Sequence, residues 1–331
     1  MKRASGVALV VILAVVLAGC TGCAWLRGSG VDRTGGSSSG EAAAGSAKVP
    51  VVIYLAREGR LEPVLRSVAG PEEQCPLAAV QALVAGPTAV EKQKGLGAVL
   101  PASTRVLGVK VAGGMAVVDL SREVITRVSE IGPSSTTEAL ALGALYFTLV
   151  QFRGVEKVRV LVEGKSRGTV DGRRVEDFWG HIGLPDPLAG SMSLLDVPAR
   201  QEVGEPTDGL SLASVRWSAH PGVFRLVFQV EGPRGETTTV IPATEATYSA
   251  GSRVVHVTIN GMRGTRVAGL APGQKVDFGD WRAETLCWDI VEDDQAYGFS
   301  LALRPGRAYG WRLWSLPDPA RVVVDVFACG R

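Results

Sequence analysis

The chain has 331 residues, of which 46% are hydrophobic and 21% charged, and its formal net charge at pH 7 is +2. This composition excludes a disordered chain and, at this length, indicates a globular protein with two domains of ordinary size. The small net charge and the absence of a long basic run exclude the electrostatic pattern of a nucleic-acid-binding protein.

The N-terminal residues have the order of a secretory signal. Basic residues at positions 2 and 3 precede an apolar run from Val7 to Leu17, which is shorter than the about 20 residues that a membrane-spanning helix needs. The ending Leu17-Ala18-Gly19-Cys20 resembles the lipobox of bacterial lipoproteins, in which the cysteine is diacylated and becomes the mature N-terminus. The resemblance implies a signal peptide over 1–19 and a membrane anchor at Cys20, on the outer face of the cytoplasmic membrane. The alternative is a plain secretory signal with an incidental cysteine.

Residues 20–48 are predicted to form a flexible tether. The stretch from Gly28 to Lys48 consists mainly of Gly, Ser and Ala with scattered charge, and it has too few apolar side chains to fold. Such a tether would hold the folded part of the chain away from the membrane.

Residues 49–180 are predicted to form an α+β domain. The expected strands are Val51–Leu55, Leu61–Val68, Arg105–Val111, Met115–Leu120 and Val155–Glu163, with helices starting at Pro76 and covering Ala139–Phe152. The pair Gly113-Gly114 readily supplies the positive φ values of a tight hairpin turn, and Gly86-Pro87 is a common helix stop. The second helix is apolar on nearly every face, which indicates that it is buried. The order of the elements describes an α+β sandwich with helices packed on one sheet.

The segment from about Val51 to Gly164 resembles the GerMN domain of bacterial sporulation and germination lipoproteins. The matching pieces are LEPV from Leu61, AVQALVAGP from Ala79, LPASTRVLGV from Leu100, AVVDLS from Ala116 and ALALGALYFTLVQFRGVEKVRVLVEG from Ala139. The family more often has two apolar residues before the proline of the first piece, where this chain has Leu61 and Glu62. The resemblance implies a module for association with other envelope proteins or with itself.

Residues 181–210 are predicted to be a linker across the surface, and residues 211–331 an all-β domain. Short strands alternate there with turn signals such as Asn260-Gly261 and Pro305-Gly306, which is typical of a β-sandwich or barrel. The expected strands are Arg225–Val230, Arg253–Ile259, Leu286–Val291, Tyr297–Leu303, Trp311–Leu316 and Arg321–Phe327. Five of the seven Trp lie in this part, and their rings suit the thick core of a sandwich.

Two pieces of this all-β part, FRLVF from Phe224 and LPDPARVVVDV from Leu316, resemble the two ends of an AMIN-type domain. The match is closer to the AMIN-like variety of Gram-positive lipoproteins. AMIN-type domains are small β-sandwiches that localise envelope proteins to peptidoglycan, so the resemblance implies wall binding. Arg321 and Asp325 fall inside the match, and the plainer interpretation of both is outward residues of a strand that pair across the sheet. The sequence does not assign Trp311 or Trp314 to a face.

No catalytic or metal-binding pattern stands out in the sequence. The three histidines, His181, His220 and His256, lack zinc-ligand spacing, and no nucleotide-binding glycine motif follows a strand. The acidic run at 292–294 is compatible with a calcium or acid–base site, but a solvated turn is the simpler interpretation. We therefore expect no enzyme activity, no metal and no cofactor.

The five cysteines allow several roles. Cys20 and Cys23 have CxxC spacing at the lipidated end, where no fold follows them. Cys75 precedes a helix start, so it is either a reactive thiol or a buried inert one. Cys287 and Cys329 are the pair within one predicted domain, and an extracellular location permits a disulfide between them.

The sequence thus predicts a non-catalytic envelope lipoprotein with two binding modules. In the first hypothesis it is a scaffold in sporulation or germination that binds protein partners through its first domain and peptidoglycan through its second. In the second it regulates or assists a peptidoglycan amidase or hydrolase, because AMIN domains often accompany amidases. In the third it captures a solute for a transporter, which would require a ligand cleft between two α/β lobes, and the all-β second half disagrees with that.

Overall fold

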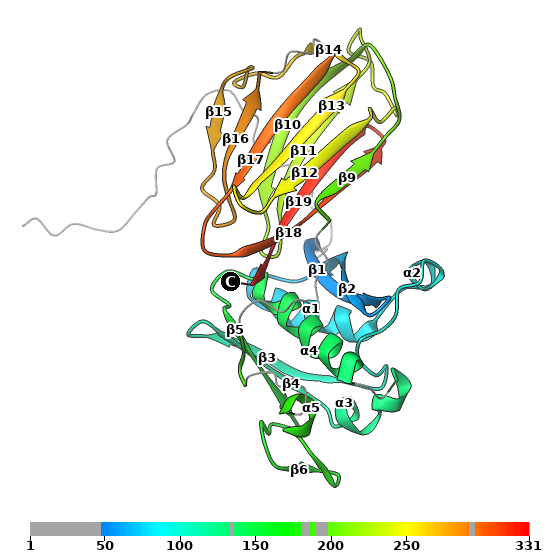
Figure 1. Ribbon diagram of the computed structural model, residues 1–331, viewed down its shortest axis with the longest axis vertical. Coiled ribbons are helices and arrows are strands. Elements are labelled where there is room, and N and C mark those ends of the chain that lie inside the picture. The colour runs from blue at the N-terminus through cyan, green and yellow to red at the C-terminus, as the bar shows by residue number, and fades with distance from the viewer. Residues whose placement is uncertain (1–47, 133–134, 181–185, 190–197, 291–294, 331) are drawn as a thin grey trace, which may run out of the picture.

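The computed structural model describes residues 48–330 except 133–134, 181–185, 190–197 and 291–294. Two domains follow one another along the long axis of the molecule, a mixed α/β domain and an all-β domain (Figure 1). The predicted signal peptide and Cys20 lie outside the described residues, as does nearly all of the tether. None of the described helices is both long enough and apolar enough to cross a membrane.

The first domain begins with an antiparallel hairpin of β1 (Lys48–Arg57) and β2 (Arg60–Ala69). Glu58 and Gly59, with φ of 50° and 77°, make the two-residue turn that joins them. The central residues of β1 are buried, because both neighbouring helices pack against this strand.

Several helices, a four-stranded sheet and a small two-stranded sheet complete the described part of the first domain. Its remaining elements are η1 (Glu72–Gln74), α1 (Cys75–Ala85), α2 (Ala89–Gln93), β3 (Val106–Ala112), β4 (Met115–Leu120), α3 (Glu123–Thr126), η2 (Val128–Glu130), α4 (Ser135–Val150), β5 (Lys157–Val162), β6 (Thr169–Val170), β7 (Arg173–Arg174), α5 (Asp177–Gly180) and β8 (Leu188–Ala189). The sheet has the order β3-β4-β5-β8, with β4 and β5 parallel and the other pairs antiparallel. Gly113 and Gly114 have φ of 55° and 81°, which confirms the hairpin turn predicted between β3 and β4.

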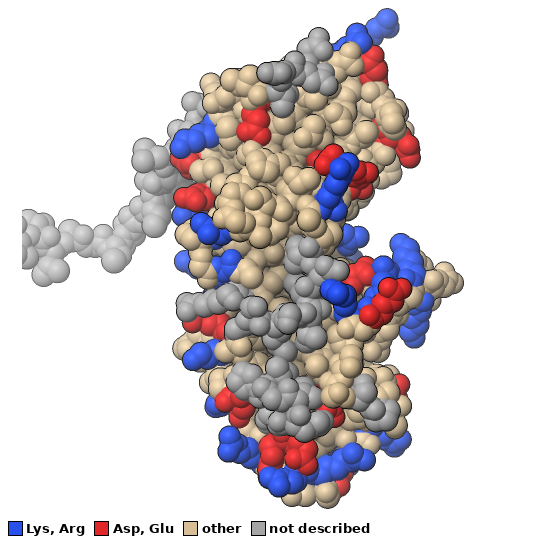
Figure 2. Space-filling view, viewed as in Figure 1, with Lys and Arg blue, Asp and Glu red and all other residues tan. Residues whose placement is uncertain are grey.

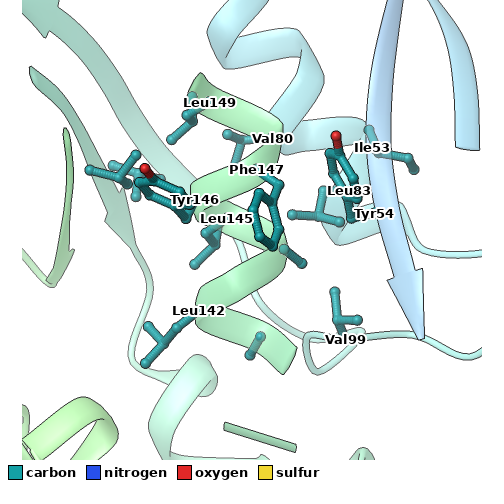
Figure 3. Close-up of a cluster of buried hydrophobic side chains, with 14 of the residues drawn as sticks. Ile53, Tyr54, Val80, Leu83, Val99, Leu142, Leu145, Tyr146, Phe147 and Leu149 are labelled. Carbon is teal, nitrogen blue, oxygen red and sulfur yellow. The ribbon is translucent and has the colours of Figure 1, made fainter. Parts of the chain in front are cut away.

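Helix α4 lies between two sheets, which corrects the prediction of helices on one sheet. The β1–β2 hairpin forms a sheet of its own, and α4 contacts this hairpin as well as β5. In Figure 3, Phe147 points toward Tyr54 of β1, with ring centroids 5.4 Å apart, and Tyr146 points to the opposite side. Every residue of α4 from Leu140 onward is buried, because each face of the helix has a sheet or α1 against it.

The second domain is a sandwich of two sheets. Its strands are β9 (Arg200–Val203), β10 (Leu210–Ala219), β11 (Phe224–Glu231), β12 (Thr244–Ser249), β13 (Val254–Asn260), β14 (Met262–Thr265), β15 (Lys275–Asp277), β16 (Ala283–Asp289), β17 (Ala296–Leu303), β18 (Ala308–Pro317) and β19 (Ala320–Gly330). The five-stranded sheet has the order β14-β10-β11-β19-β18, and the six-stranded sheet has the order β15-β16-β17-β13-β12-β9. Phe228 of one sheet meets Phe299 of the other, with ring centroids 4.7 Å apart, in a continuous apolar core.

The segment expected to be a linker contributes a strand to each domain. Within 181–210, β8 pairs with β5 at the edge of the first domain's sheet, and β9 pairs with β12 at the edge of the second domain's sheet. The Gln201 side chain of β9 also bonds to β18, accepting from Leu313 N at 3.0 Å and donating to Trp311 O at 3.1 Å. This short strand therefore connects the edges of the two sheets of the sandwich.

The end of β19 packs into the core of the first domain. Phe327 and Cys329 belong to the same buried cluster as β1 and α4. The Tyr54 hydroxyl lies 3.6 Å from Cys329 Sγ, and burial raises the pKa of the Cys329 thiol to about 12. Gly310, which faces Phe327 from β18, has no room for a side chain, because a Cβ there would lie 2.2 Å from Phe327 Cε2. The two domains thus share one interface with core-like packing.

Polar contacts add to this interface. Arg307 of the second domain donates to Val150 O at 3.3 Å and to Val155 O at 3.2 Å, so it satisfies a carbonyl at the C-terminal end of α4. Within the first domain itself, the side chain of Gln151 accepts from Val52 N at 2.8 Å and donates to Val52 O at 2.6 Å, pairing with β1 as a neighbouring strand would.

Candidate functional site

The outer face of the five-stranded sheet carries three residues that the sequence singled out, Trp314, Arg321 and Asp325, together with further charged and polar side chains. Alternation along β11 sends Phe224, Leu226 and Phe228 into the core, so Arg225 and Gln229 point outward. The register places Arg225 opposite Asp325 of β19, which in turn faces β18. We call this surface the arginine–tryptophan face, and its residues are Arg216, Arg225, Gln229, Trp314, Arg321 and Asp325.

A buried ion pair lies at the centre of the arginine–tryptophan face. Arg225 donates from Nε to Asp325 Oδ1 at 2.7 Å and from Nη2 to Oδ2 at 2.9 Å. Trp314 Nε1 also donates to Asp325 Oδ2 at 2.9 Å, and the Arg225 guanidinium lies 5.0 Å from the centroid of the Trp314 ring. Asp325 is only 1% exposed, so its charge is fully taken up by these partners. This arrangement holds the Trp314 ring and the Arg225 side chain in one orientation.

Two further arginines border this pair. Arg216 donates to Gln229, and Arg321 donates to the carbonyls of Pro319 and Asp318 at 3.1 and 3.0 Å. Both guanidinium groups are therefore oriented by neutral acceptors, and their positive charge is not cancelled by those contacts. The face combines a fixed indole ring with cations, which suits a ligand that has both apolar sugar surfaces and carboxylates.

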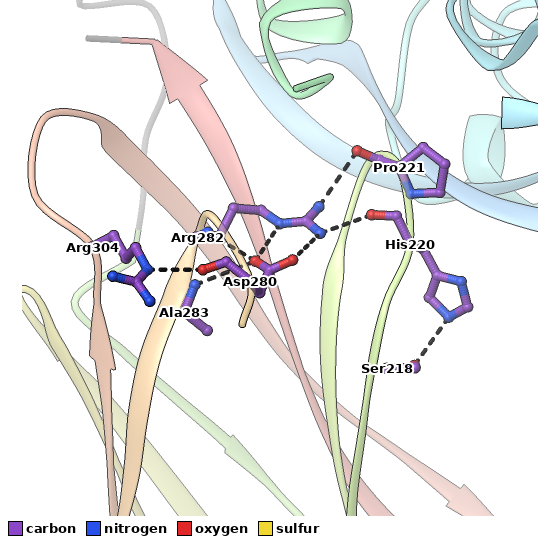
Figure 4. Close-up of polar contacts among 7 residues, drawn as sticks. All are labelled: Ser218, His220, Pro221, Asp280, Arg282, Ala283 and Arg304. Atoms are coloured by element: carbon purple, nitrogen blue, oxygen red, sulfur yellow. Dashed lines mark hydrogen bonds and ion pairs between the residues drawn. The ribbon is translucent and has the colours of Figure 1, made fainter. Parts of the chain in front are cut away.

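His220 lies beside the arginine–tryptophan face, with its Nε2 3.0 Å from Ser218 Oγ (Figure 4). Burial lowers the pKa of His220, and the charges of Arg225 and Arg282 lower it further against the opposing charge of Asp325. A hydroxyl next to a neutral imidazole is one part of a nucleophile–base pair. The Asp325 carboxylate, however, is occupied by Arg225 and Trp314 and does not orient the His220 ring.

A second buried ion pair joins the sandwich to the interface between the domains. Arg282 is 1% exposed and donates to both carboxylate oxygens of Asp280, at 3.0 and 2.9 Å, and to His220 O at 2.8 Å (Figure 4). Burial alone would raise the pKa of Asp280, but the hydrogen bonds and charge of Arg282 hold it below its ordinary value. Both charges are neutralised by each other, so this pair positions the loop after β10 and offers no reactive group.

The structure separates the predicted site residues. Trp311 is buried in the sandwich core, and Trp314, three residues on, lies on the outer face. Arg321 and Asp325 lie on that face as well, and Asp325 pairs across the sheet with Arg225 of β11. Residues 292–294 and His181 lie outside the described residues, and so does Cys23. His256, on β13, bonds to Ser300 through Nδ1 at 2.9 Å.

The described cysteines are free thiols, so the possible disulfide between Cys287 and Cys329 is not formed. Cys287 lies on β16 in the six-stranded sheet, whereas Cys329 is buried beside Tyr54 in the first domain's core. Cys75 is buried as well, where burial raises the pKa of its thiol and the carboxylates of Glu72 and Glu73 raise it further. Both effects favour the alternative of a buried, inert Cys75.

Some residues that matter for the arrangement were missed by the sequence. Three of them, Gln151, Arg282 and Arg307, form hydrogen bonds to residues more than 60 positions away in the sequence, and no local motif marks them. Among the residues that the structure describes, no group of three or more His, Cys, Asp or Glu is arranged to hold a metal ion.

Comparison with known proteins gives a match for the first domain. Residues 52–168 match the family model Germane, described as sporulation and spore germination. One similar solved structure is the tandem GerMN domains of the sporulation protein GerM from Bacillus subtilis, at 21% identity over 48% of this chain and 54% of that chain, with a TM-score of 0.31. The first GerMN domain of the same protein is 23% identical over 43% of this chain and 97% of that chain, with a TM-score of 0.29.

A further similar structure is a candidate lipoprotein from Clostridium perfringens, at 22% identity over 45% of this chain and 86% of that chain, with a TM-score of 0.25. None of the curated proteins compared matches the chain.

Proposed function

We propose that this chain, which carries a domain of the Germane family over residues 52–168, is a non-catalytic, lipid-anchored scaffold of the cell envelope in sporulation or spore germination. The family match is the observation that carries the proposal. The first domain associates with other envelope proteins, and the second binds peptidoglycan. The anchor at Cys20 keeps both between the membrane and the wall.

The lipobox supports the membrane anchor. The order of basic start, short apolar run and Leu-Ala-Gly-Cys fits a signal that ends at a lipidated cysteine. Labelled palmitate should enter the wild-type chain in a bacterial host and should not enter the Cys20→Ser variant. Unlabelled wild-type chain in the cytosol would contradict the anchor.

The arginine–tryptophan face supports wall binding by the second domain. Its fixed Trp314 ring can stack on a sugar, and Arg216 and Arg321 can pair with the carboxylates of peptidoglycan. The resemblance of the second domain to AMIN-type domains points to the same ligand. The outer surface of a sheet also suits a long polymer better than it suits a small solute, because small solutes usually bind in concave pockets.

A sedimentation assay with purified peptidoglycan sacculi tests the wall binding. Cys20→Ser chain should co-sediment with sacculi, and the double variant Arg216→Glu, Arg321→Glu should lose most of this binding without touching the buried Asp325 pair. Lys275→Glu is the matched control, because Lys275 is exposed on the opposite sheet. Equal binding by the double variant and the control would reject the arginine–tryptophan face as the wall-binding surface.

The same incubation distinguishes a scaffold from a hydrolase. We expect no soluble muropeptides from sacculi incubated with the chain alone. Release of muropeptides by the chain itself would overturn the non-catalytic proposal. If the chain increased the release of muropeptides by an added amidase, the result would favour a role as regulator of a wall hydrolase.

A further inference from the structure

A cleft of about 630 Å³ lies between the two domains. It borders the arginine–tryptophan face, because Arg312 in its lining is the cross-strand partner of Asp325. The first domain lines it with the tip of the β1–β2 hairpin, with β2 and with the segment after α2. The second domain lines it with residues of β9 and β18. Figure 2 shows a notch at the right edge of the molecule, with blue and red side chains around it.

Both walls of the cleft are fixed. On the first domain, Arg66 holds α2 against β2 through two hydrogen bonds to Glu91, at 2.7 and 2.6 Å. On the second, Gln201 joins β9 to β18. The shared core at Phe327 fixes the position of one wall relative to the other. A ligand would therefore meet a preformed site and would not have to order it.

The two walls each present a cation that no described carboxylate neutralises. Arg57 pairs with Glu62 at 2.9 Å, but neither Lys94 on the first domain nor Arg312 on the second has a described acidic partner within 4.0 Å. Both side chains are exposed, and apolar groups such as Leu61 and Pro63 line the cleft between them. This pattern recognises a ligand with separated carboxylates and an apolar middle.

The geometry argues against recognition by strand addition. Pro63 lacks an N–H on the open edge of β2, and the Leu65 carbonyl already accepts from Arg66 Nη1 at 3.2 Å. Recognition must then come from side chains. The exposed carboxylate of Glu58 also lines the cleft, so a ligand that carries an amine as well as carboxylates can pair with charges of both signs.

We propose that the cleft between the domains binds a short peptide that carries both carboxylates and an amine, the chemistry of an uncrosslinked peptidoglycan stem peptide. The assignment of this peptide to peptidoglycan rests on the proposed wall association. The arginine–tryptophan face then contacts the glycan, and the cleft contacts the peptide that branches from it.

The test uses calorimetric titration of the full-length chain in detergent micelles. The probe is a disaccharide tetrapeptide from purified peptidoglycan, and the same disaccharide without peptide is the second probe. The double variant Lys94→Ala, Arg312→Ala should bind the tetrapeptide probe about tenfold more weakly than wild type. The double variant Lys110→Ala, Lys275→Ala removes two exposed lysines away from the cleft and should bind like wild type.

The outcomes separate this proposal from the wall-binding proposal. Equal affinity of the cleft variant and wild type, or an equal weakening for the probe without peptide, would overturn the cleft as a peptide site. If the chain bound sacculi but not the tetrapeptide probe, the peptide site in the cleft would be rejected and the proposed wall binding would stand. Failure of the chain to bind sacculi would reject the proposed function.

Discussion

Asp325 is a buried carboxylate that depends on two neighbours, Arg225 and Trp314. Asp325→Ala leaves the Arg225 guanidinium without its counter-charge, and removing one partner of a buried pair typically costs about 3–5 kcal/mol. Because the Arg225 side chain is 20% exposed and can reach water, we expect a loss near the lower end, about 3 kcal/mol in the free energy of unfolding. Urea denaturation followed by tryptophan fluorescence measures it.

Trp314→Phe is the control for this prediction, because it keeps an aromatic ring and removes one hydrogen bond, worth about 1 kcal/mol. A loss in Asp325→Ala no larger than the loss in Trp314→Phe would show that the ion pair contributes little.

Glu91 provides a pH-dependent contribution to stability. The hydrogen bonds from Arg66, aided by the Thr88 amide and hydroxyl, lower the pKa of Glu91 from 4.5 to about 2. A carboxyl with a lowered pKa in the folded state stabilises the fold above its unfolded pKa, and this stabilisation is lost as the pH falls from 4.5 to about 2. Wild type should therefore be more stable than Glu91→Gln at neutral pH, and the difference should shrink over that range. A constant difference would contradict the cause given for the shift.

The tryptophans show what the sequence could not decide at the residue scale. Trp311 and Trp314 are three positions apart on one strand, so alternation predicts that they lie on opposite faces. Which of the two faces is outward depends on how this strand pairs with β19 and how β19 pairs with β11. The residues that pair there, Arg225 and Asp325, are 100 positions apart in the sequence. The pairing that builds the arginine–tryptophan face is a long-range property, and single-strand patterns do not contain it.

At the level of elements, Gln151 substitutes for a missing strand. Its side chain satisfies both backbone groups of Val52 on β1. Gln151→Leu leaves a buried N–H and C=O without partners, so we expect a loss of about 2 kcal/mol in the free energy of unfolding. Chemical denaturation of the variant measures this loss.

Gln93→Leu, at the exposed end of α2, is the matched control and should change stability by less than about 0.5 kcal/mol. If the two variants were equally stable, the Gln151 hydrogen bonds would not hold β1 in place.

Elements governed by local rules were predictable from the sequence, and those governed by distant pairing were not. The turn at Gly113-Gly114 and the end of α1 at Gly86 follow from glycine conformations. The apolar surface of α4 indicated that the helix is buried. The sequence of a helix alone does not show whether one sheet or two sheets pack against it. β9 is a four-residue polar strand that exists because β12 offers an edge, so its sequence looks like a linker.

Over the whole molecule, the shared core predicts that the two domains unfold together. Phe327 is 2% exposed and lies in the core of the first domain although it belongs to the sandwich. Phe327→Ala should lower the free energy of unfolding by about 3–5 kcal/mol. It should also speed hydrogen exchange of the α4 amides.

Val324→Ala is the control, because Val324 faces the core of the sandwich. It should destabilise the sandwich with less effect on α4 exchange. Equal α4 exchange in both variants, or two separate unfolding transitions in wild type, would contradict the coupling through β19.

The placement of Phe327 and Cys329 has a consequence for how the protein is made. A polypeptide is synthesised from its N-terminus, and N-terminal domains commonly fold while the rest is still being produced. Here the hydrophobic interior that starts at Val51 also contains Phe327 and Cys329, which follow it by 276 and 278 positions. The first domain therefore stays incompletely packed until the ribosome has added Phe327 and Cys329. Ribosomes stalled shortly before Phe327 would carry a first half that is still sensitive to protease.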